Sequence, residues 1–183
     1  MTNNKESTAV IDRLIEDHSE KAYVTAFRLT GNQADACDLV QETFLRIMKK
    51  AELYDAAFDL GGWLHRVLFR VYLNSRRANE RRREVSLEPA YGDDGSAAEY
   101  KTDPNESPEK IMENNELRDR ISEALGTLSP DMRACVVLVD IEGYNYEQAA
   151  EALGWPVGSV SGRLFRARHI LRDILKQAEG EHI

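Results

Sequence analysis

Residues 144–172 read YNYEQAAEALGWPVGSVSGRLFRARHILR. They predict a short amphipathic helix at about 146–153, a turn, and a second helix that is rich in arginine. Gly154 suits the left-handed backbone position that ends a helix, and Pro156 prevents the first helix from resuming. Two helices joined by a tight turn are therefore expected in the last third of the chain.

The second of these helices has one apolar side. Ser159 is its expected N-cap, and no acidic residue lies between Ser159 and Arg172. A short helix, a glycine-containing turn and a basic helix together suit the major groove of duplex DNA. The alternative is a solvated basic helix on an ordinary bundle, but the short helix and the turn favour DNA. The apolar stripe comprises Val160, Leu164, Ala167, Leu171 and Ile174.

The composition of the chain is that of a globular protein with free thiols. Its 183 residues are 42% hydrophobic, enough for one domain or two small ones. Cys37 and Cys135 are far apart in sequence, which favours reduced, buried cytosolic thiols over a disulfide framework. The sequence has no apolar run long enough to span a membrane, and its polar beginning lacks a signal region. We therefore expect a cytoplasmic protein without membrane insertion.

The charge of the chain is strongly segregated. The formal net charge is −8. Residues 84–116 hold ten acidic and two basic residues, a net of −8, so the rest of the chain sums to zero. Residues 63–83 hold seven arginines and one glutamate, a net of +6. Because local charge governs docking on DNA, the acidic total does not exclude a DNA-binding protein.

The pattern of apolar residues predicts an all-α fold. A first long helix, with an expected interruption near His18, would end at Gly31, and Asn32 would cap the next helix. A loop at about 53–62, with Gly61 and Gly62 as its hinge, would precede a helix at about 63–83. The sequence contains no alternating strand pattern of useful length.

The chain is predicted to form two small helical domains. Residues 84–115 are rich in charge, proline, glycine and serine, and this composition predicts a flexible acidic linker. The second domain, 116–183, would contain the helix-turn-helix. Within it, Ser129 followed by Pro130 and Asp131 predicts the start of a helix that ends at Gly143. The first domain would be 1–83.

The helix at 63–83 combines arginines with aromatic residues. Such a surface suits single-stranded DNA, because cations follow the phosphates and rings stack on exposed bases. The alternative is that the aromatic residues belong to the core and the arginines are solvated; for Trp63 alone, core packing is favoured. The basic stripe comprises Arg66, Arg70, Asn74, Arg77 and Arg81, and the aromatic surface would comprise Trp63, His65, Phe69 and Tyr72, with Phe58 in the preceding loop.

The second helix has a polar face beside a wide apolar face. The apolar face would comprise Leu39, Val40, Phe44, Leu45, Ile47 and Met48, and the polar face Asp35, Asp38, Gln41, Glu42 and Arg46. An acidic surface is poorly placed for DNA, so it could dock a protein. An ordinary solvated face is the alternative.

Five motifs follow one another along the chain: DLVQETF at 38–44, WL at 63–64, DIEGYNYE at 140–147, VGSV at 157–160 and RLFRAR at 163–168. In this order they resemble a bacterial RNA polymerase sigma factor of the small, two-domain extracytoplasmic-function (ECF) group of the sigma-70 family. The resemblance covers nearly all of both predicted domains, and the order of the motifs is far more specific than a helix-turn-helix alone.

The resemblance implies a promoter-specific transcription initiation factor that binds core RNA polymerase and melts the −10 element. It implies that the linker threads toward the RNA channel of the polymerase, and that an anti-sigma protein is a candidate partner. The implied polymerase-binding residues are Asp38, Gln41, Glu42 and Phe44. The implied −10 residues are Phe58, Trp63, Arg66, Arg70, Asn74 and Arg77. The implied −35 residues are Ser159, Ser161, Arg163, Phe165, Arg166 and Arg168.

Two departures from the family pattern concern the DNA contacts. The family commonly has asparagine where Arg70 stands, although Asn74 is kept. It often has a lysine or arginine followed by serine where Ser161 and Gly162 stand, so a long donor to a guanine edge is absent. Base reading is therefore expected to shift to Arg163, Phe165 and Arg166.

Two other classes of protein were weighed. A conventional helix-turn-helix regulator that acts without polymerase would explain 117–177 equally well, but not the basic and aromatic helix at 63–83. An enzyme is disfavoured because the sequence has no nucleophile motif and no phosphate-binding glycine loop. No metal-ligand spacing with the cysteines is found for His18, His65, His169 or His182. We expect no cofactor, metal or catalytic residue.

Overall fold

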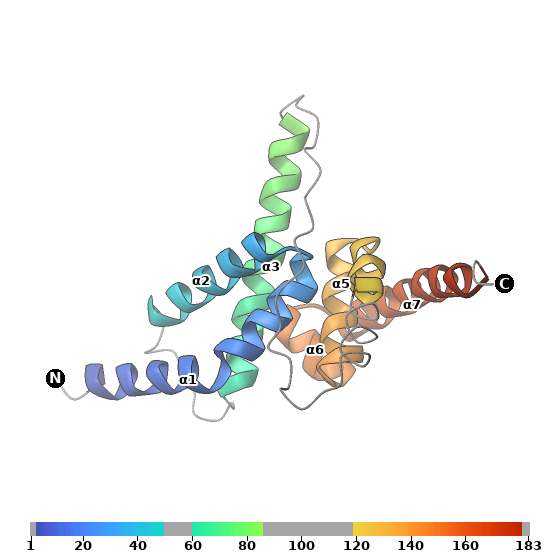
Figure 1. Cartoon of the computed structure of the whole chain (residues 1–183). Coiled ribbons are helices and arrows are strands. Elements are labelled where there is room, and N and C mark those ends of the chain that lie inside the picture. Colours follow the sequence, from blue (N-terminus) through green and yellow to red (C-terminus); the bar gives the residue numbers. More distant parts are fainter. Residues whose placement is uncertain (1–2, 50–59, 86–118, 181–183) are drawn as a thin grey trace, which may run out of the picture.

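The computed structural model describes residues 3–49, 60–85 and 119–180, and within these ranges every regular element is helical (Figure 1). The prediction of an all-α fold is confirmed. No helix in the described ranges is long and apolar enough to cross a membrane. The elements are α1 (Asn3–Thr30), α2 (Gln33–Lys49), α3 (Leu60–Val85), α5 (Pro130–Val136), η2 (Val137–Ile141), α6 (Tyr146–Leu153) and α7 (Val157–Gly180), with a further helical segment at 119–126.

The junction between α1 and α2 follows the local sequence signals. Gly31 has φ of 84°, a left-handed conformation that glycine adopts without strain. The Asn32 side chain accepts a hydrogen bond from the backbone N–H of Asp35 at 2.7 Å, which caps α2. The expected interruption near His18 is wrong, because α1 continues through it. That segment contains neither glycine nor proline, so nothing in its backbone opposes a helix.

The start of α3 differs from the expected loop. The helix begins at Leu60, so Gly61 and Gly62 lie in its first turn and form no hinge. Leu60 packs against the core, and this contact holds the start of the helix one residue before the two glycines. The rest of the expected loop, and with it Phe58, lies outside the described residues.

Helices α1, α2 and α3 pack on one another and enclose a core that contains Leu14, Leu29 and Ile47, all fully buried. The expectation of an aromatic surface on α3 is wrong for three of its four members. His65, Phe69 and Tyr72 are only 4%, 0% and 1% exposed. His65 meets Tyr144 of the C-terminal segment, and Phe69 meets the His65 ring edge-to-face, in a core where burying an aromatic ring is strongly favourable.

The C-terminal helices begin and end at capping residues. Ser129 accepts a hydrogen bond from the N–H of Met132, and Pro130 occupies the first turn of α5, as predicted. Asn145 and Gln148 form a reciprocal capping box at the start of α6. Gly154 ends α6 with φ of 69°. The stop at Gly143, which has φ of 76°, is also close to the prediction, although the helix first widens into the π-helical turn η2.

Helix α7 begins three residues earlier than expected. Its first residue is Val157, and the N–H of Ser159 already donates to the carbonyl of Pro156 at 2.9 Å. Ser159 is therefore inside the first turn, and its prediction as the N-cap is wrong. The buried stripe is confirmed, since Val160, Leu164 and Ala167 are fully buried.

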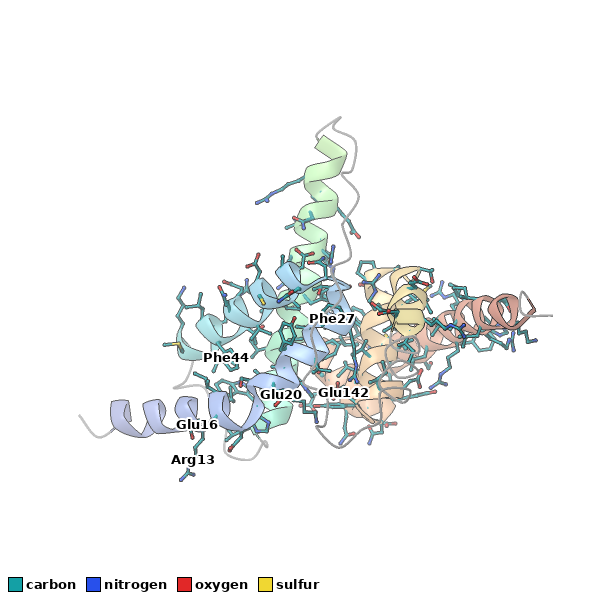
Figure 2. All side chains as sticks on the ribbon, in the orientation of Figure 1. Arg13, Glu16, Glu20, Phe27, Phe44 and Glu142 are labelled. Atoms are coloured by element: carbon teal, nitrogen blue, oxygen red, sulfur yellow. The ribbon has the colours of Figure 1, made fainter. Side chains whose placement is uncertain are left out.

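The N-terminal and C-terminal helices also pack against each other. Helix α3 contacts α6 and α5, and α1 contacts α5 and η2, so the buried residues form one continuous cluster. Figure 2 shows Glu142, at the end of η2, beside α1. The basic stripe of α3 and the helix-turn-helix are thereby held next to each other.

Candidate nucleic-acid and protein interfaces

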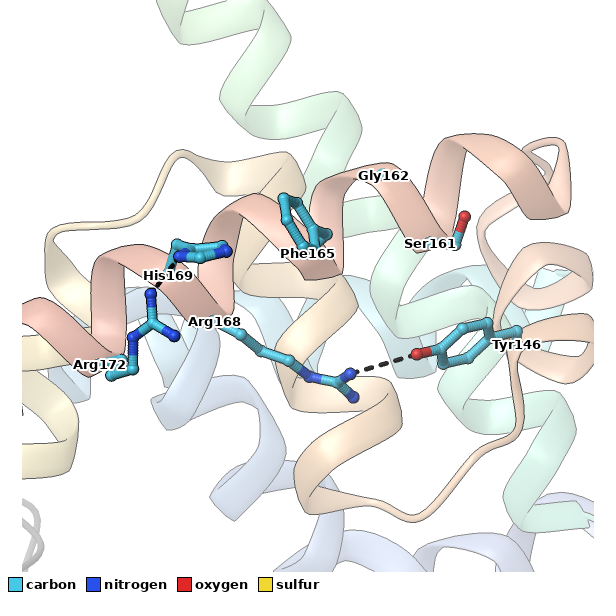
Figure 3. A pocket seen from close by; sticks show the side chains of 7 residues that line it. All are labelled: Tyr146, Ser161, Gly162, Phe165, Arg168, His169 and Arg172. Carbon is cyan, nitrogen blue, oxygen red and sulfur yellow. Dashed lines mark hydrogen bonds between the residues drawn. The ribbon is translucent and has the colours of Figure 1, made fainter.

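The exposed side of α7 borders a shallow groove of about 570 Å³ (Figure 3). Phe165 is 65% exposed, which is unusual for a large apolar side chain. Its ring meets the imidazole of His169 edge-to-face at 4.5 Å between centroids. This contact orients the Phe165 ring without burying it. The groove is lined by Tyr146, Ser161, Gly162, Phe165, Arg168, His169 and Arg172.

Arg168 is oriented by groups outside α7. Its Nη2 donates to Asp140 Oδ1 at 2.6 Å, and its Nε donates to Oδ2 at 3.2 Å. Nη1 donates to the hydroxyl of Tyr146 at 3.2 Å. These hydrogen bonds, above all those to Asp140, raise the pKa of Arg168. The guanidinium is therefore a fixed positive charge beside the groove.

Arg163 and Arg166 are one turn apart but differ in their surroundings. Arg163 donates to Asp131 and to the carbonyl of Ser159, both at 3.2 Å. Its guanidinium also lies over the Trp155 ring, 4.5 Å from the centroid. Arg166 is exposed, and among the described residues its side chain donates only to the Gly162 carbonyl of the same helix. The structure thus ties Arg163 to the fold and directs Arg166 to solvent.

The two serines predicted at the DNA contact are both partly exposed. The hydroxyl of Ser161 donates to the carbonyl of Gly158 at 3.2 Å and lines the groove. Ser159 lies in the first turn, where its carbonyl is the acceptor for Arg163.

The basic stripe of α3 is divided between solvent and the C-terminal helices. Arg70, Asn74 and Arg77 are exposed. Arg66 forms an ion pair with Glu151 of α6. Trp63 is partly buried and packs against the core, as the sequence analysis favoured for this residue. The exposed part of the stripe is thus purely polar, and its expected aromatic neighbours are directed inward.

The exposed face of α2 is both acidic and apolar. Asp38 and Gln41 are exposed, and Glu42 pairs with Arg46 at 2.6 Å. Phe44 is partly buried against the core. Leu45 and Met48, assigned to the buried side from the sequence, are 50% and 55% exposed. The exposure of Leu45 and Met48 could have been inferred from the sequence, because the apolar face of α2 is wider than the stripe a helix needs to pack against one core.

Family comparisons agree with both halves of the chain. Residues 14–82 match the family described as sigma-70 region 2, and residues 118–171 match the family described as sigma-70, region 4. The first match spans α2 and most of α1 and α3, and the second spans the helix-turn-helix.

Individual relatives extend over nearly the whole chain. The chain is 40% identical over 170 residues to the ECF RNA polymerase sigma factor SigE of Mycolicibacterium smegmatis, covering 93% of this chain but 63% of that protein. It is 36% identical over 151 residues to the ECF sigma factor EcfG of Rhodopseudomonas palustris, covering 82% and 76% of the two chains.

A solved structure has the same overall architecture. The sigma factor RpoE of Bartonella quintana, crystallised with the anti-sigma factor NepR, superimposes with a TM-score of 0.64 at 26% identity. The superposition covers 94% of this chain and 95% of that one. Together with the matches to both family regions, this similarity shows that the chain belongs to the ECF group of the sigma-70 family of RNA polymerase sigma factors, which are promoter-directing transcription initiation factors.

Proposed function

We propose that this chain binds core RNA polymerase in the cytoplasm, directs it to a −35 and a −10 promoter element, and melts the −10 region without catalysing a reaction itself. The observation that carries the proposal is the presence of three chemically distinct surfaces in one chain. These are the exposed side of α7, the basic stripe of α3, and the acidic and apolar face of α2.

The −35 element would be read by the exposed side of α7. A helix of this kind enters the major groove, where an arginine can donate to a guanine edge and an apolar ring can contact a thymine methyl group. Arg166 and Phe165 have the exposure that these two roles require. Arg168, fixed by Asp140, would serve as a positioning charge for the phosphate backbone. Arg163 would act through the fold, by orienting the first turn of α7.

The −10 element would bind along α3. Arg70, Asn74 and Arg77 offer an exposed polar stripe to the phosphates of a melted strand. Because His65, Phe69 and Tyr72 are buried, stacking on exposed bases would depend on Phe58 and Trp63. Arg66 would join the stripe when it is released from Glu151.

Core polymerase would dock on the α2 face. Leu45 and Met48 supply exposed apolar area there, and Asp38 and Glu42 supply charge that selects a basic partner. The double variant Asp38→Arg with Glu42→Arg should therefore lose co-elution with core polymerase, because both charges reverse at the centre of the contact.

The control for this test is Glu147→Arg with Glu123→Arg, which reverses two exposed acids of the C-terminal helices and changes the net charge equally. Circular dichroism should show full helicity for both variants. Unchanged co-elution of the α2 variant would refute this docking surface. Absence of any polymerase binding by the native chain would instead favour the conventional helix-turn-helix regulator. By analogy with the RpoE structure, an anti-sigma protein is a further proposed partner.

A further inference from the structure

Arg133 of α5 is hydrogen-bonded only to neutral groups within the described ranges. Its Nη1 donates to the carbonyl of Leu29 at 2.8 Å, and its Nη2 donates to the carbonyl of Gly126 at 2.9 Å. Its Nε is buried and has no hydrogen-bond partner among the described residues. Burial lowers the pKa of Arg133, because a desolvated positive charge is unfavourable. The guanidinium therefore keeps one unpaired N–H and has no hydrogen-bonded counter-charge in this part of the chain.

Tyr72 of α3 places a second unpaired polar group in the same region. The residue is 1% exposed, and its hydroxyl has no hydrogen-bond partner among the described residues. Burial raises the pKa of Tyr72, whereas the positive charges of Arg133 and Arg76 act in the opposite direction. Both guanidinium groups are thus within electrostatic reach of the hydroxyl, where α3 packs on α5. Leaving two buried donors unpaired is costly, so an acceptor that reaches both would be bound favourably.

The charged side chains around Tyr72 carry an excess of positive charge. The Arg76 guanidinium lies 5.7 Å from the centroid of the Tyr72 ring, and its Nη2 pairs with Asp35 at 3.4 Å. Asp131, which also influences Tyr72, pairs with an arginine of α7 at 3.2 Å. Each of these two aspartates thus already has an arginine partner, and the α5 arginine is a third cation. The cluster lacks one negative charge.

We propose that Nε of Arg133 and the hydroxyl of Tyr72 bind a small monovalent anion of the chloride class. A halide ion accepts hydrogen bonds from both groups and supplies the missing negative charge, which acts strongly in a region shielded from water. A water molecule would accept the same two bonds but would leave the excess charge in place. Arg133 is itself partly exposed, so the ion has a route from solvent. This site does not depend on the proposed function, because neither DNA nor polymerase takes part in it.

An anion that binds only the folded chain stabilises it by mass action. The folding equilibrium constant is multiplied by one plus the ratio of the chloride concentration to its dissociation constant. Chloride at ten times that constant should therefore raise the folding equilibrium constant about elevenfold.

The test compares the native chain with Tyr72→Phe and Tyr23→Phe by chemical denaturation with urea, in chloride and in gluconate at the same ionic strength. Gluconate is too large to enter a buried site. Tyr72→Phe removes only the hydroxyl that would donate to the ion, and Tyr23→Phe makes the same change at a partly buried tyrosine of α1. Chloride should stabilise the native chain and Tyr23→Phe equally and should leave Tyr72→Phe unchanged. Salt effects common to all three chains cancel in this comparison.

The result in gluconate distinguishes an anion from a bound water. Without chloride, Tyr72→Phe should be at least as stable as the native chain, because it removes a buried hydroxyl that lacks a partner. Lower stability of Tyr72→Phe in both salts would show that the hydroxyl has a partner other than the anion, and would overturn the proposal. An equal response of all three chains to chloride would overturn it as well.

Bromide locates the ion directly. Crystals of the full chain soaked in sodium bromide should show an anomalous peak at the bromine edge within hydrogen-bond distance of Nε of Arg133 and of the Tyr72 hydroxyl. A water at that position overturns the proposal. A bromide peak there without the chloride response in solution would mean an adventitious ion only, which also overturns it.

Discussion

At the scale of single residues, the two arginines in the middle of α7 have different consequences. Arg163 neutralises the half-buried Asp131 and lies over Trp155, so it stabilises the contact between α5 and α7. Within the part of the chain that the structure describes, the Arg166 side chain forms a hydrogen bond only within its own helix. A recognition helix needs residues of both kinds, because base reading is accurate only when the helix itself is held rigidly.

We expect alanine substitutions at these positions to separate stability from recognition. Arg166→Ala should leave the melting temperature unchanged and weaken −35 binding by about 1–3 kcal/mol if it reads a base. Arg163→Ala should destabilise the fold by about 1–2 kcal/mol, since Asp131 loses its partner and Trp155 its cation. Thermal unfolding and binding titrations on a cognate and an unrelated duplex measure both effects.

The titrations also distinguish a base contact from a phosphate contact. If Arg166 contacts a phosphate, its substitution will weaken both duplexes alike and lower the slope of log K against log salt by about one. Loss of stability in Arg166→Ala with unchanged DNA binding would contradict the assignment. Equal effects of the two substitutions would contradict the difference in their surroundings.

At the scale of elements, the turn between α6 and α7 depends on the left-handed conformation of Gly154. A Cβ built there would meet only Nη2 of Arg70, at 3.8 Å, which is an ordinary contact. A side chain at this position would therefore destabilise the chain through the left-handed backbone conformation and not through steric crowding. Gly126, in the helical segment at 119–126, has open space around it and no positive φ.

Gly154→Ala should destabilise the chain by about 1–2 kcal/mol, because an L-residue is disfavoured in the left-handed region. Gly126→Ala, the matched control, should stabilise it by about 0.4–1 kcal/mol by restricting the unfolded chain. Chemical denaturation of the two variants and the native chain measures the difference. A Gly154→Ala variant as stable as the native chain would show that the turn can be made in another way.

At the scale of the whole molecule, charge is distributed so that acids can compete with DNA. The segment 84–116 carries −8, equal to the net charge of the chain, and it follows directly on the basic helix α3. Most of it lies outside the described residues. Within them, Glu151 already pairs with an arginine of α3. Competition by the acidic segment would add to this contact at low salt, where exposed charges are least screened.

Neutralising the ten acids of 84–116 by Asp→Asn and Glu→Gln should therefore raise the DNA affinity of the free chain, most at low ionic strength. The control is a chain in which the same residues of this segment are shuffled, so that charge and composition are kept. Each is titrated on one promoter fragment at two salt concentrations. Equal DNA affinities of all three chains at low salt would show that the segment only connects the two units and does not compete with DNA.

Features that depend on neighbouring residues could be predicted from the sequence. Gly31, Gly143 and Gly154 end helices where expected, because each supplies a left-handed conformation within its own turn. The stripe at Val160, Leu164 and Ala167 is buried, because helical periodicity places these residues on one side. The family motifs could be recognised from the sequence because each is a short continuous stretch of residues.

The partner of each polar or aromatic side chain could not be predicted in this way, because long-range packing sets it. The same local pattern allowed His65, Phe69 and Tyr72 to lie at a surface, but the packing of α3 against the other helices buries them. The sequence gives no sign that Arg163 pairs with Asp131, 32 residues away. The same is true of Arg66 and Glu151, which are 85 residues apart. Such pairs arise from long-range packing. Helical periodicity predicts on which face of a helix a residue lies, but not which other element packs against that face.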